Sequence, residues 1–371
     1  MQEERKKILQ MIEDGKISAD EGVDLLNALK ETEKEKHGAK SDKGSETEEQ
    51  SLSRDVDWEK GTGYRQTEQK VSSFASKFTD FIEDAVQKIK EFDLDFNFGS
   101  SVEIQHIFQH KEATVRHADI SIENGSITFR PWEEDDIRVE CNVKVYKVRD
   151  SDEARRHFLD EVVFDLSNEK LRLESRKKSM KVNTIVYVPK KDLERLKLYA
   201  FNGKLTGEHV SVKKFEAQTV NGRISFDEVE AEDVRLETVN GTISISKLQS
   251  EHCDAKTVNG TVAISAAKGD IDAETLNGTI NYKLLKPSNS RAYLKTTTGS
   301  VTFTVPENVK TEGELKTTVG GIHCDLPNVS VIDEKKEIAS KKMTFLSNRD
   351  EESASVYIEA EATTGSITVR N

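Results

Sequence analysis

Hydrophobic and polar residues alternate along most of the chain after residue 93, a pattern typical of β-strands. Examples are Val102-Glu-Ile104, Ile137-Arg-Val139 and Val143-Lys-Val145. Residues 181–189, KVNTIVYVP, are rich in β-branched side chains and end at a proline, which predicts a strand that stops there. Residues 152–160, DEARRHFLD, break the alternation and predict a short helical insertion.

Residues 1–30 carry a helical pattern instead. Ile8, Leu9 and Ile12 share one helical face, and Gly15 supplies a C-cap. Ser18 and Glu21 form a capping box that opens a second helix. Because an αα-hairpin of this size cannot bury a core alone, we expect it to dock on a protein partner or to self-associate.

A second amphipathic helix is predicted over residues 71–92, after a charged, polar tether at 31–70 that we expect to be flexible. Its apolar stripe recurs at steps of three and four residues, at Phe74, Phe78, Phe81, Ala85, Ile89 and Phe92. The opposite face mixes acidic and basic residues, whereas a membrane-surface helix favours lysine and arginine. We therefore expect this helix to cap one end of the β domain. The alternative is a partner or membrane face formed by Phe74, Phe78, Phe81 and Phe92.

The sequence repeats itself in the middle of the β region. An Asn-Gly pair recurs at intervals of 19, 19, 19 and 18 residues, and apolar residues follow three and five positions after each of the last four asparagines. The pairs are Asn202-Gly203, Asn221-Gly222, Asn240-Gly241, Asn259-Gly260 and Asn277-Gly278. A fixed period near 20 is the signature of a repeat architecture.

Two folds can accommodate Asn-Gly between alternating strands. β-Hairpins commonly turn at this dipeptide, but a meander of hairpins need not keep the same columns at a constant spacing. A solenoid must, because identical positions stack in register and asparagine columns can form hydrogen-bonded ladders. We predict a mainly β protein: a parallel β-solenoid of about 19–22 residues per coil over residues 93–371. Weaker copies follow at 298–303, 319–324 and 364–369, with an earlier one at 120–129. The gap between 319 and 364 predicts one coil disrupted by the polar stretch 332–352.

Composition fits this prediction and narrows the function. Of 371 residues, 35% are hydrophobic and 6% aromatic, which suffices for a core one coil wide, and the net charge of −13 disfavours nucleic acid as a partner. No apolar stretch approaches the roughly 20 residues of a membrane span, and no signal-peptide pattern opens the chain. Cys141, Cys253 and Cys324 lie far apart and do not suggest disulfides. These features predict a cytoplasmic protein.

Catalytic and metal-binding patterns are weak. Parallel β-helix enzymes place acidic residues on one outer face, and the candidates here are Asp227, Glu228, Glu230, Glu232 and Asp233. These acids do not recur in the following coils, so a solvated turn explains them better. His106, His110 and His117 lack a paired cysteine or carboxylate motif. We therefore expect no catalytic residue, no cofactor and no metal site.

The series VYVPKKDLERLKL, TVNGRI, TVNGTI, TVNGTV and TLNGTI resembles the DUF4097 family, a group of adhesin-like β-solenoid proteins. The opening ERKKILQMIEDGKISADEGVDLLNAL resembles the SHOCT-like helical hairpin of the YvlB/LiaX group within that family. The resemblance implies a part in the response of Gram-positive bacteria to cell-envelope stress, with sensing of membrane-active antimicrobial peptides and an association with the membrane or cell surface. It carries no catalytic motif.

These observations together predict a non-enzymatic scaffold or regulatory binding protein. Its expected partners are a protein or a second copy at the N-terminal hairpin, and cationic peptides or a membrane surface elsewhere. The alternative is a polysaccharide-binding or carbohydrate-active β-helix enzyme.

Overall fold

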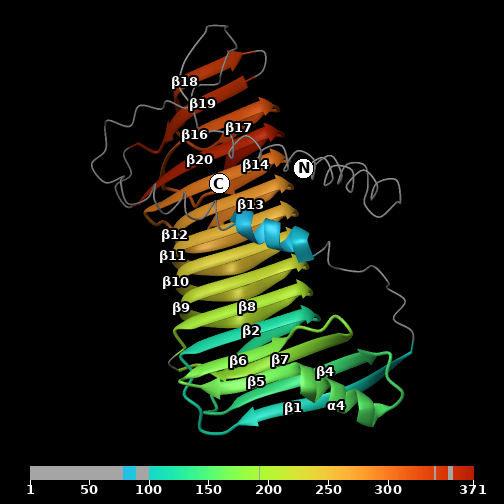
Figure 1. Ribbon diagram of the computed structural model, residues 1–371. Helices are drawn as coiled ribbons and strands as arrows, with labels where there is room; N and C mark the ends of the chain where they lie inside the picture. The colour runs from blue at the N-terminus through green and yellow to red at the C-terminus, as the bar shows by residue number, and fades with distance from the viewer. Residues whose placement is uncertain (1–77, 89–99, 192, 338–339, 350–353) are drawn as a thin grey trace, which may run out of the picture. The chain divides into compact units, whose positions relative to one another are not determined.

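The computed structural model describes residues 78–88, 100–191, 193–337, 340–349 and 354–371 (Figure 1). The expected helical hairpin at 1–30, the tether at 31–70, and both Phe74 and Phe92 lie outside these residues. Strands make up most of the described chain. They are accompanied by a helix at 78–88 and by α4 (Ser151–Glu161), which confirms the predicted insertion.

The strands stack as the coils of a parallel solenoid. Asn221 of β9 (Leu205–Asn221) pairs with Asn240 of β10 (Ile224–Asn240), which pairs with Asn259 of β11 (Ile243–Asn259), and Asn259 pairs with Asn277 of β12 (Val262–Asn277). The described strands form one continuous hydrogen-bonded sheet of 21 strands. Each coil makes two passes, one ending at the Asn-Gly turn and one beginning after it, and we call the two faces that these passes form the first and the second sheet. The fold prediction is thereby confirmed, and a meander of hairpins is excluded for these coils because the pairings are parallel.

The first sheet contains the passes that end at the turn (Figure 1). In spatial order its strands are β5 (Val162–Ser167), β6 (Lys170–Ser175), β2 (His117–Asn124), β8 (Arg195–Asn202), the C-terminal halves of β9 (Leu205–Asn221), β10 (Ile224–Asn240), β11 (Ile243–Asn259) and β12 (Val262–Asn277), then β14 (Ser290–Thr298), β20 (Ser355–Thr364), β16 (Lys310–Val319), β19 (Ser340–Ser347) and β18 (Ser330–Glu337).

The second sheet contains the passes that begin at the turn. Its order is β1 (Ser101–His110), β4 (Ile137–Tyr146), β7 (Met180–Pro189), β3 (Ile127–Trp132), the N-terminal halves of β9 to β12, β13 (Ile280–Leu284), β15 (Val301–Thr304), β21 (Ile367–Arg370) and β17 (Ile322–Asp325).

The core lies between the two sheets and is built column by column. The buried core side chains of β10 are Ile224, Phe226, Val229, Ala231, Val234 and Leu236, and the residues between them are exposed or half-buried. Each such side chain contributes about 1.5–3 kcal/mol when fully buried, and it stacks on its equivalents in β9 and β11. The core is therefore continuous along the stack, and the polar positions are left for the outer faces.

The C-terminal coils are not stacked in chain order. Thr364 of β20 pairs with Thr298 of β14 on one side and with Val319 of β16 on the other. β18 and β19 pair antiparallel with each other and continue the first sheet beyond β16. The predicted disruption of a coil between 319 and 364 is confirmed, because these two strands do not form a parallel coil. The insertion of the last coil between two earlier ones was not predicted.

The helix at 78–88 caps the flank of the solenoid and not its end. It lies on the outer face of the first sheet, where Phe81 and Ala85 form a buried cluster with Phe201 and Val220 (Figure 1). The end that begins with β1 is covered instead by α4, whose Phe158 is buried in the main core. The periodicity of the sequence identified the buried face of the helix, but it did not indicate which surface of the solenoid the helix would meet.

Candidate functional site

The Asn-Gly turns form a seam that runs along the stack. Each asparagine side chain donates a hydrogen bond from Nδ2 to Oδ1 of the asparagine in the preceding coil. The distances are 3.1 Å for Asn202 to Asn124, 2.8 Å for Asn221 to Asn202, 2.9 Å for Asn240 to Asn221, 2.9 Å for Asn259 to Asn240 and 3.1 Å for Asn277 to Asn259. Their amide groups bond mainly to one another, so we assign the seam a structural role.

The glycines of the seam are required by close packing between coils. A Cβ atom on Gly241 would lie 1.8 Å from the carbonyl oxygen of Gly222, and Gly203, Gly222, Gly260 and Gly278 meet their neighbours in the same way. The Thr238 hydroxyl completes the contact by donating to the Gly222 carbonyl at 3.1 Å. A ligand has no access to backbone groups that are already bonded from coil to coil.

The apolar part of the outer face is covered by the helix at 78–88. Phe78 and Phe81 pack against Phe201, Tyr199 and Val239 together with the buried residues of that cluster. Lys88 holds the C-terminal part of the helix in place: its Nζ lies 2.9 Å from Tyr199 Oη and 3.3 Å from Glu123 Oε1. Phe78 and Phe81 therefore contact the solenoid in this structure, and membrane contact by this stripe stays a prediction.

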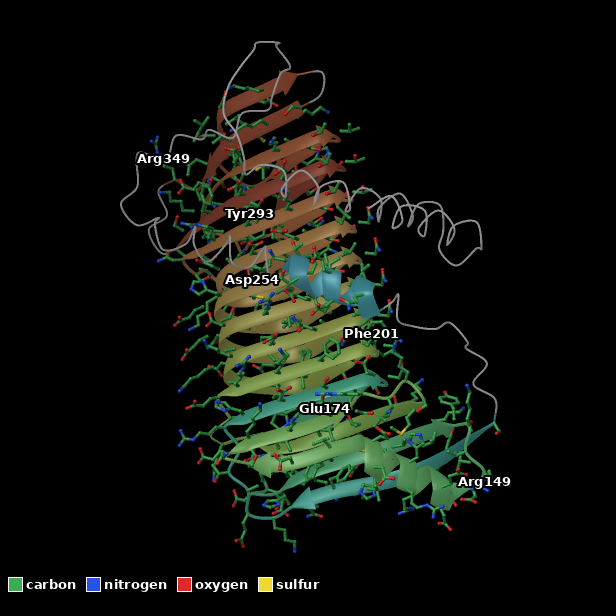
Figure 2. The ribbon with its side chains drawn as sticks, in the orientation of Figure 1. Arg149, Glu174, Phe201, Asp254, Tyr293 and Arg349 are labelled. Carbon is green, nitrogen blue, oxygen red and sulfur yellow. The ribbon has the colours of Figure 1, made fainter. Side chains whose placement is uncertain are left out.

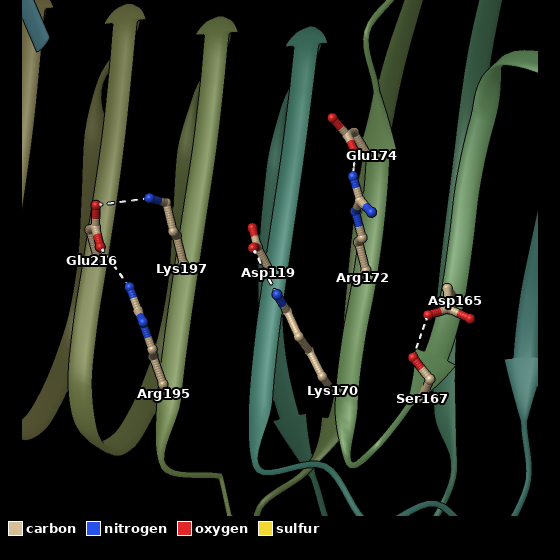
Figure 3. A network of polar contacts seen from close by, with 9 residues as sticks. All are labelled: Asp119, Asp165, Ser167, Lys170, Arg172, Glu174, Arg195, Lys197 and Glu216. Atoms are coloured by element: carbon tan, nitrogen blue, oxygen red, sulfur yellow. Dashed lines mark hydrogen bonds and ion pairs between the residues drawn. The ribbon is translucent and has the colours of Figure 1, made fainter.

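The polar columns of the first sheet are paired on the side of β2 and β8. Lys197 lies 3.2 Å from Glu216 on the next strand, and Lys170 lies 3.6 Å from Asp119 (Figure 3). Opposite charges in register satisfy one another across the strands. This part of the outer face offers little unbalanced charge to a partner.

Lys197 and Glu216 belong to a column of outward-facing residues that continues through Arg235 of β10. This column becomes acidic at the next two strands, β11 and β12. Asp254 of β11 and Asp272 of β12 are paired in register, so two carboxylates follow one another where a base and an acid alternate elsewhere. Neither has an ion pair with a described residue. Figure 2 labels Asp254 on this sheet, together with Tyr293 two strands beyond it.

The environment of these two carboxyls disfavours their charged forms. Burial raises the pKa of Asp254 to about 6. The nearby Lys256 and Arg235 lower this pKa by more than Glu237 and Glu274 raise it, so burial is the cause of the shift. Burial also raises the pKa of Asp272 to about 7, with further repulsion from Glu274 and Asp254. A cation placed beside these two carboxyls would therefore stabilise their charged forms and lower both pKa values.

Three further acids extend this region, which we call the acidic stripe: Glu237, Asp254, Asp272, Glu274 and Glu359. Burial raises the pKa of Glu237 although Arg235 lies 2.6 Å away, and burial and Glu314 raise the pKa of Glu359. Three bases lie among these acids: Arg235, Lys256, which is 3.4 Å from Glu274, and Lys295, which pairs in register with Glu274. Glu237 and Lys256 are buried, and the other four acids are half-buried. The stripe therefore carries more acidic than basic groups on one face of the solenoid.

The acids singled out from the sequence lie elsewhere. Asp227, Glu230, Glu232 and Asp233 are exposed around the corner opposite the Asn-Gly seam. Glu228 bonds Lys247 and lies 2.9 Å from His209, and Glu230 accepts a hydrogen bond from Gln249. The sequence predicted a solvated turn here. The side chains make solvent-exposed contacts, but the prediction of a turn was wrong, because strand β10 continues through this corner and pairs with both neighbours.

The histidines and cysteines do not assemble a site in the described part of the chain. His106 packs against Phe108 and Phe158 in the core, whereas His110 ends β1 and His117 begins β2 in the other sheet. Among the described residues, no cluster of three His, Cys, Asp or Glu could hold a metal ion. Cys141 and Cys253 are buried, and burial raises the pKa of the Cys141 thiol to about 12.

The acidic stripe was not recognised from the sequence, although a signal for it was present. Val234, Cys253 and Ile271 occupy one buried column of successive coils. The next position in each coil holds Arg235, Asp254 and Asp272, so two consecutive acids in this outward-facing column are the sequence signal for the stripe.

The coils stack in register, form two sheets and are joined at the Asn-Gly seam by hydrogen bonds from coil to coil. The protein is therefore a two-sheet parallel β-solenoid. Residues 115–370 match the family model described as Toastrack DUF4097, and the chain belongs to that family. Residues 3–34 match the model of a SHOCT-like domain. The helices described here include none that is both long and apolar enough to span a membrane.

The chain is 42% identical to the uncharacterized protein YvlB of Bacillus subtilis strain 168, over 371 residues that cover 100% of this chain and 99% of that protein. Among solved structures, it is similar to an adhesin-like protein of Bacteroides fragilis, with 9% identity, a TM-score of 0.42 and coverage of 73% and 98% of the two chains. An adhesin-like protein of Parabacteroides distasonis matches with 10% identity, a TM-score of 0.38 and coverage of 72% and 97%.

Proposed function

We propose that the protein is a non-enzymatic binding scaffold that takes up a cationic ligand on its acidic stripe. The observation that carries the proposal is the pairing of Asp254 with Asp272, two carboxylates in register with raised pKa values. A lysine or arginine side chain placed between them would lower the pKa of both and remove their mutual repulsion. Elsewhere on the same sheet, bases of the protein itself supply this compensation.

A cationic, membrane-active peptide is the ligand class that we propose. Such peptides carry several bases along an extended or helical backbone, and the stripe presents the half-buried Asp254 and Asp272 on two adjacent strands about 4.8 Å apart. The net charge of −13 adds a long-range attraction that speeds the encounter. A role in the response to cell-envelope stress, as the family resemblance implies, follows as part of the same proposal.

Binding of a lysine-rich amphipathic peptide to the full chain tests the proposal. We expect the dissociation constant to rise about tenfold, or 1.4 kcal/mol, in the Asp254→Asn/Asp272→Asn variant, and binding of the wild type to weaken with salt. The matched control is Asp227→Asn/Glu232→Gln, which removes the same net charge from the exposed corner and should leave the affinity nearly unchanged. Equal losses in both variants would show that net charge alone drives binding and would refute the stripe as the site.

The alternative function is that of a carbohydrate-active enzyme, and a turnover assay distinguishes it from a binding scaffold. A polysaccharide panel incubated with the protein and calcium should show no turnover. Turnover that disappears on replacing Asp227 or Glu230 would overturn the non-enzymatic proposal.

A further inference from the structure

Apolar side chains form a column on the outer face of the first sheet, next to the Asn-Gly seam. In five successive coils, the residue directly before the asparagine of the seam is apolar. These residues, which we call the apolar column, are Phe201, Val220, Val239, Val258 and Leu276. Because neighbouring strands lie about 4.8 Å apart, the column extends about 19 Å along the stack.

The helix at 78–88 covers one end of this column. Phe201 and Val220 are buried in a cluster with Phe81 and Ala85, and Val239 packs against the margin of that cluster. Val258 and Leu276 lie beyond the cluster and are half-buried. The column therefore continues an established helix-binding surface toward the strands that carry the acidic stripe.

The far end of the apolar column and the two carboxyls of the stripe lie on the same strands. Asp254 precedes Val258 in β11, and Asp272 precedes Leu276 in β12, in both cases by four residues on the same face. Four residues of a strand span about 13 Å, and a helix with its side chains is about 10–12 Å wide. One amphipathic helix lying across these strands can therefore contact the apolar column along one flank and both carboxyls along the other.

The helix at 78–88 shows this mode of binding, but its charge suits the surface poorly. Its apolar stripe lies on the column, and Lys88 Nζ lies 2.9 Å from Tyr199 Oη and 3.3 Å from Glu123 Oε1. The other charged residues of the helix are three acids, Asp80, Glu83 and Asp84, so that with Lys88 its net charge is −2. A peptide with several bases would be attracted to the acidic stripe more strongly than this helix is.

We infer that the cationic peptide binds as an amphipathic helix on the apolar column and displaces the helix at 78–88, which acts as an internal competitor for the site. The inference rests on the proposed function, because it assigns the bases of the peptide to Asp254 and Asp272. The peptide then binds only those molecules whose column is free, so its apparent dissociation constant depends on how firmly the helix is docked. Displacement leaves the solenoid closed, because the helix belongs to a cluster separate from the main core.

Hydrogen exchange of the full chain, read by mass spectrometry, tests the displacement directly. The probe is a synthetic helical peptide of lysine and leucine with one apolar face. Bound peptide should speed the exchange of amides 78–88, because the displaced helix loses its contacts. A peptide of the same composition in shuffled order cannot form an apolar stripe, so it should bind at least about tenfold more weakly and leave this exchange unchanged.

Variants on the two contacting surfaces should change the affinity in opposite directions. Phe81→Ser loosens the helix without changing the net charge, and the peptide should bind at least about threefold more tightly because more molecules have a free column. The matched control is Gln87→Ser, at an exposed position of the same helix, which should leave the affinity unchanged. Val258→Ser/Leu276→Ser removes apolar surface from the column and should weaken binding about tenfold.

The outcomes separate this inference from the proposed function. A wild type that does not bind the peptide would refute both. Binding that requires Asp254 and Asp272 but is unchanged in Phe81→Ser, with exchange at 78–88 that stays the same or slows, would refute the displacement and leave the acidic stripe as the site. Equal affinity for the helical and shuffled peptides, or full affinity in Val258→Ser/Leu276→Ser, would refute the apolar column as the surface that binds the peptide.

Discussion

A glycine such as Gly241 is held in place by its neighbour in the preceding coil. Positive φ values occur at Gly125, Gly269, Gly299 and Gly365 but not at Gly241, so the left-handed conformation that usually explains Asn-Gly is not the reason here. The reason is the position that a Cβ would take, 1.8 Å from the Gly222 carbonyl oxygen. The column of glycines therefore sets how closely the coils can stack.

Gly241→Ala is expected to lower the free energy of unfolding by about 2 kcal/mol or more, because two backbones must separate to admit the methyl group. Urea unfolding followed by circular dichroism measures this loss. Gly321→Ala is the control: the Cβ there meets only the end of the exposed His323 side chain, which can turn away. A loss of stability at Gly321 as large as that at Gly241 would contradict the explanation by backbone stacking.

The repeat was visible at the residue scale because asparagine and glycine recur unchanged at the turn of five coils, and the columns that face the core stay apolar. The sequence predicted the asparagine and glycine columns and the apolar positions around them. It did not predict the threonine contacts, since the distance that brings the Thr238 hydroxyl to the Gly222 carbonyl depends on how the chain turns at each coil.

At the scale of elements, the helix at 78–88 is attached by a small cluster that is separate from the main core. Phe81, Ala85, Phe201 and Val220 form that cluster, and residues between the sheets form the other. The helix should therefore be able to leave the solenoid without unfolding it.

Phe81→Asp tests this independence. The buried carboxylate should release the helix, so that amide hydrogens of residues 78–88 exchange faster while the melting temperature of the solenoid changes little. Hydrogen exchange read by mass spectrometry resolves the two regions. Glu83→Ala, on the exposed face of the same helix, should leave the exchange as it is. A large drop in the melting temperature of Phe81→Asp would show that the helix is part of the solenoid's cooperative unit.

The spatial order of the C-terminal coils could not be predicted from the sequence. The turns at Thr298, Val319 and Thr364 carry nearly the same motif, so any of these coils could stack on any other. Periodicity predicts which residues face the core but not which neighbour they meet. β20 inserts between β14 and β16, and β18 and β19 follow on the far side of β16. The polar stretch 332–352 predicted a disrupted coil but not this order.

At the scale of the whole molecule, charge is distributed by column. The part of the first sheet near β2 and β8 balances acid against base, and the acidic stripe does not. Net charge and composition do not locate this imbalance. The aligned repeats place Asp254 and Asp272 in one column, but the burial that raises the pKa of both carboxyls is seen only in the structure.

The stripe gives the protein a characteristic dependence of stability on pH. Asp254 and Asp272 have pKa values of about 6 and 7 in the folded protein, above the value of 3.8 for an unperturbed aspartate. Between pH 4 and 7 the folded state therefore binds more protons than the unfolded state, and these two groups make stability fall as pH rises. The lowered pKa values of Glu174, Glu194 and Glu228 act in the opposite direction, but below about pH 4.5. Burial and Arg155 lower the pKa of His106, so this histidine opposes the aspartates just below pH 6.5.

A difference between variants isolates the two aspartates from these other groups. Asp254→Asn/Asp272→Asn is expected to melt at a higher temperature than the wild type at pH 8, where it removes two carboxylates that repel each other. At pH 5 the advantage should nearly vanish, because both carboxyls of the wild type are then mostly protonated. Thermal unfolding at constant ionic strength measures both values, and Asp227→Asn/Glu232→Gln, with the same change in net charge, should show no such pH-dependent gain. A variant less stable than the wild type at pH 8 would mean that the carboxylates stabilise the fold, and that the stripe is not a site waiting for a cation.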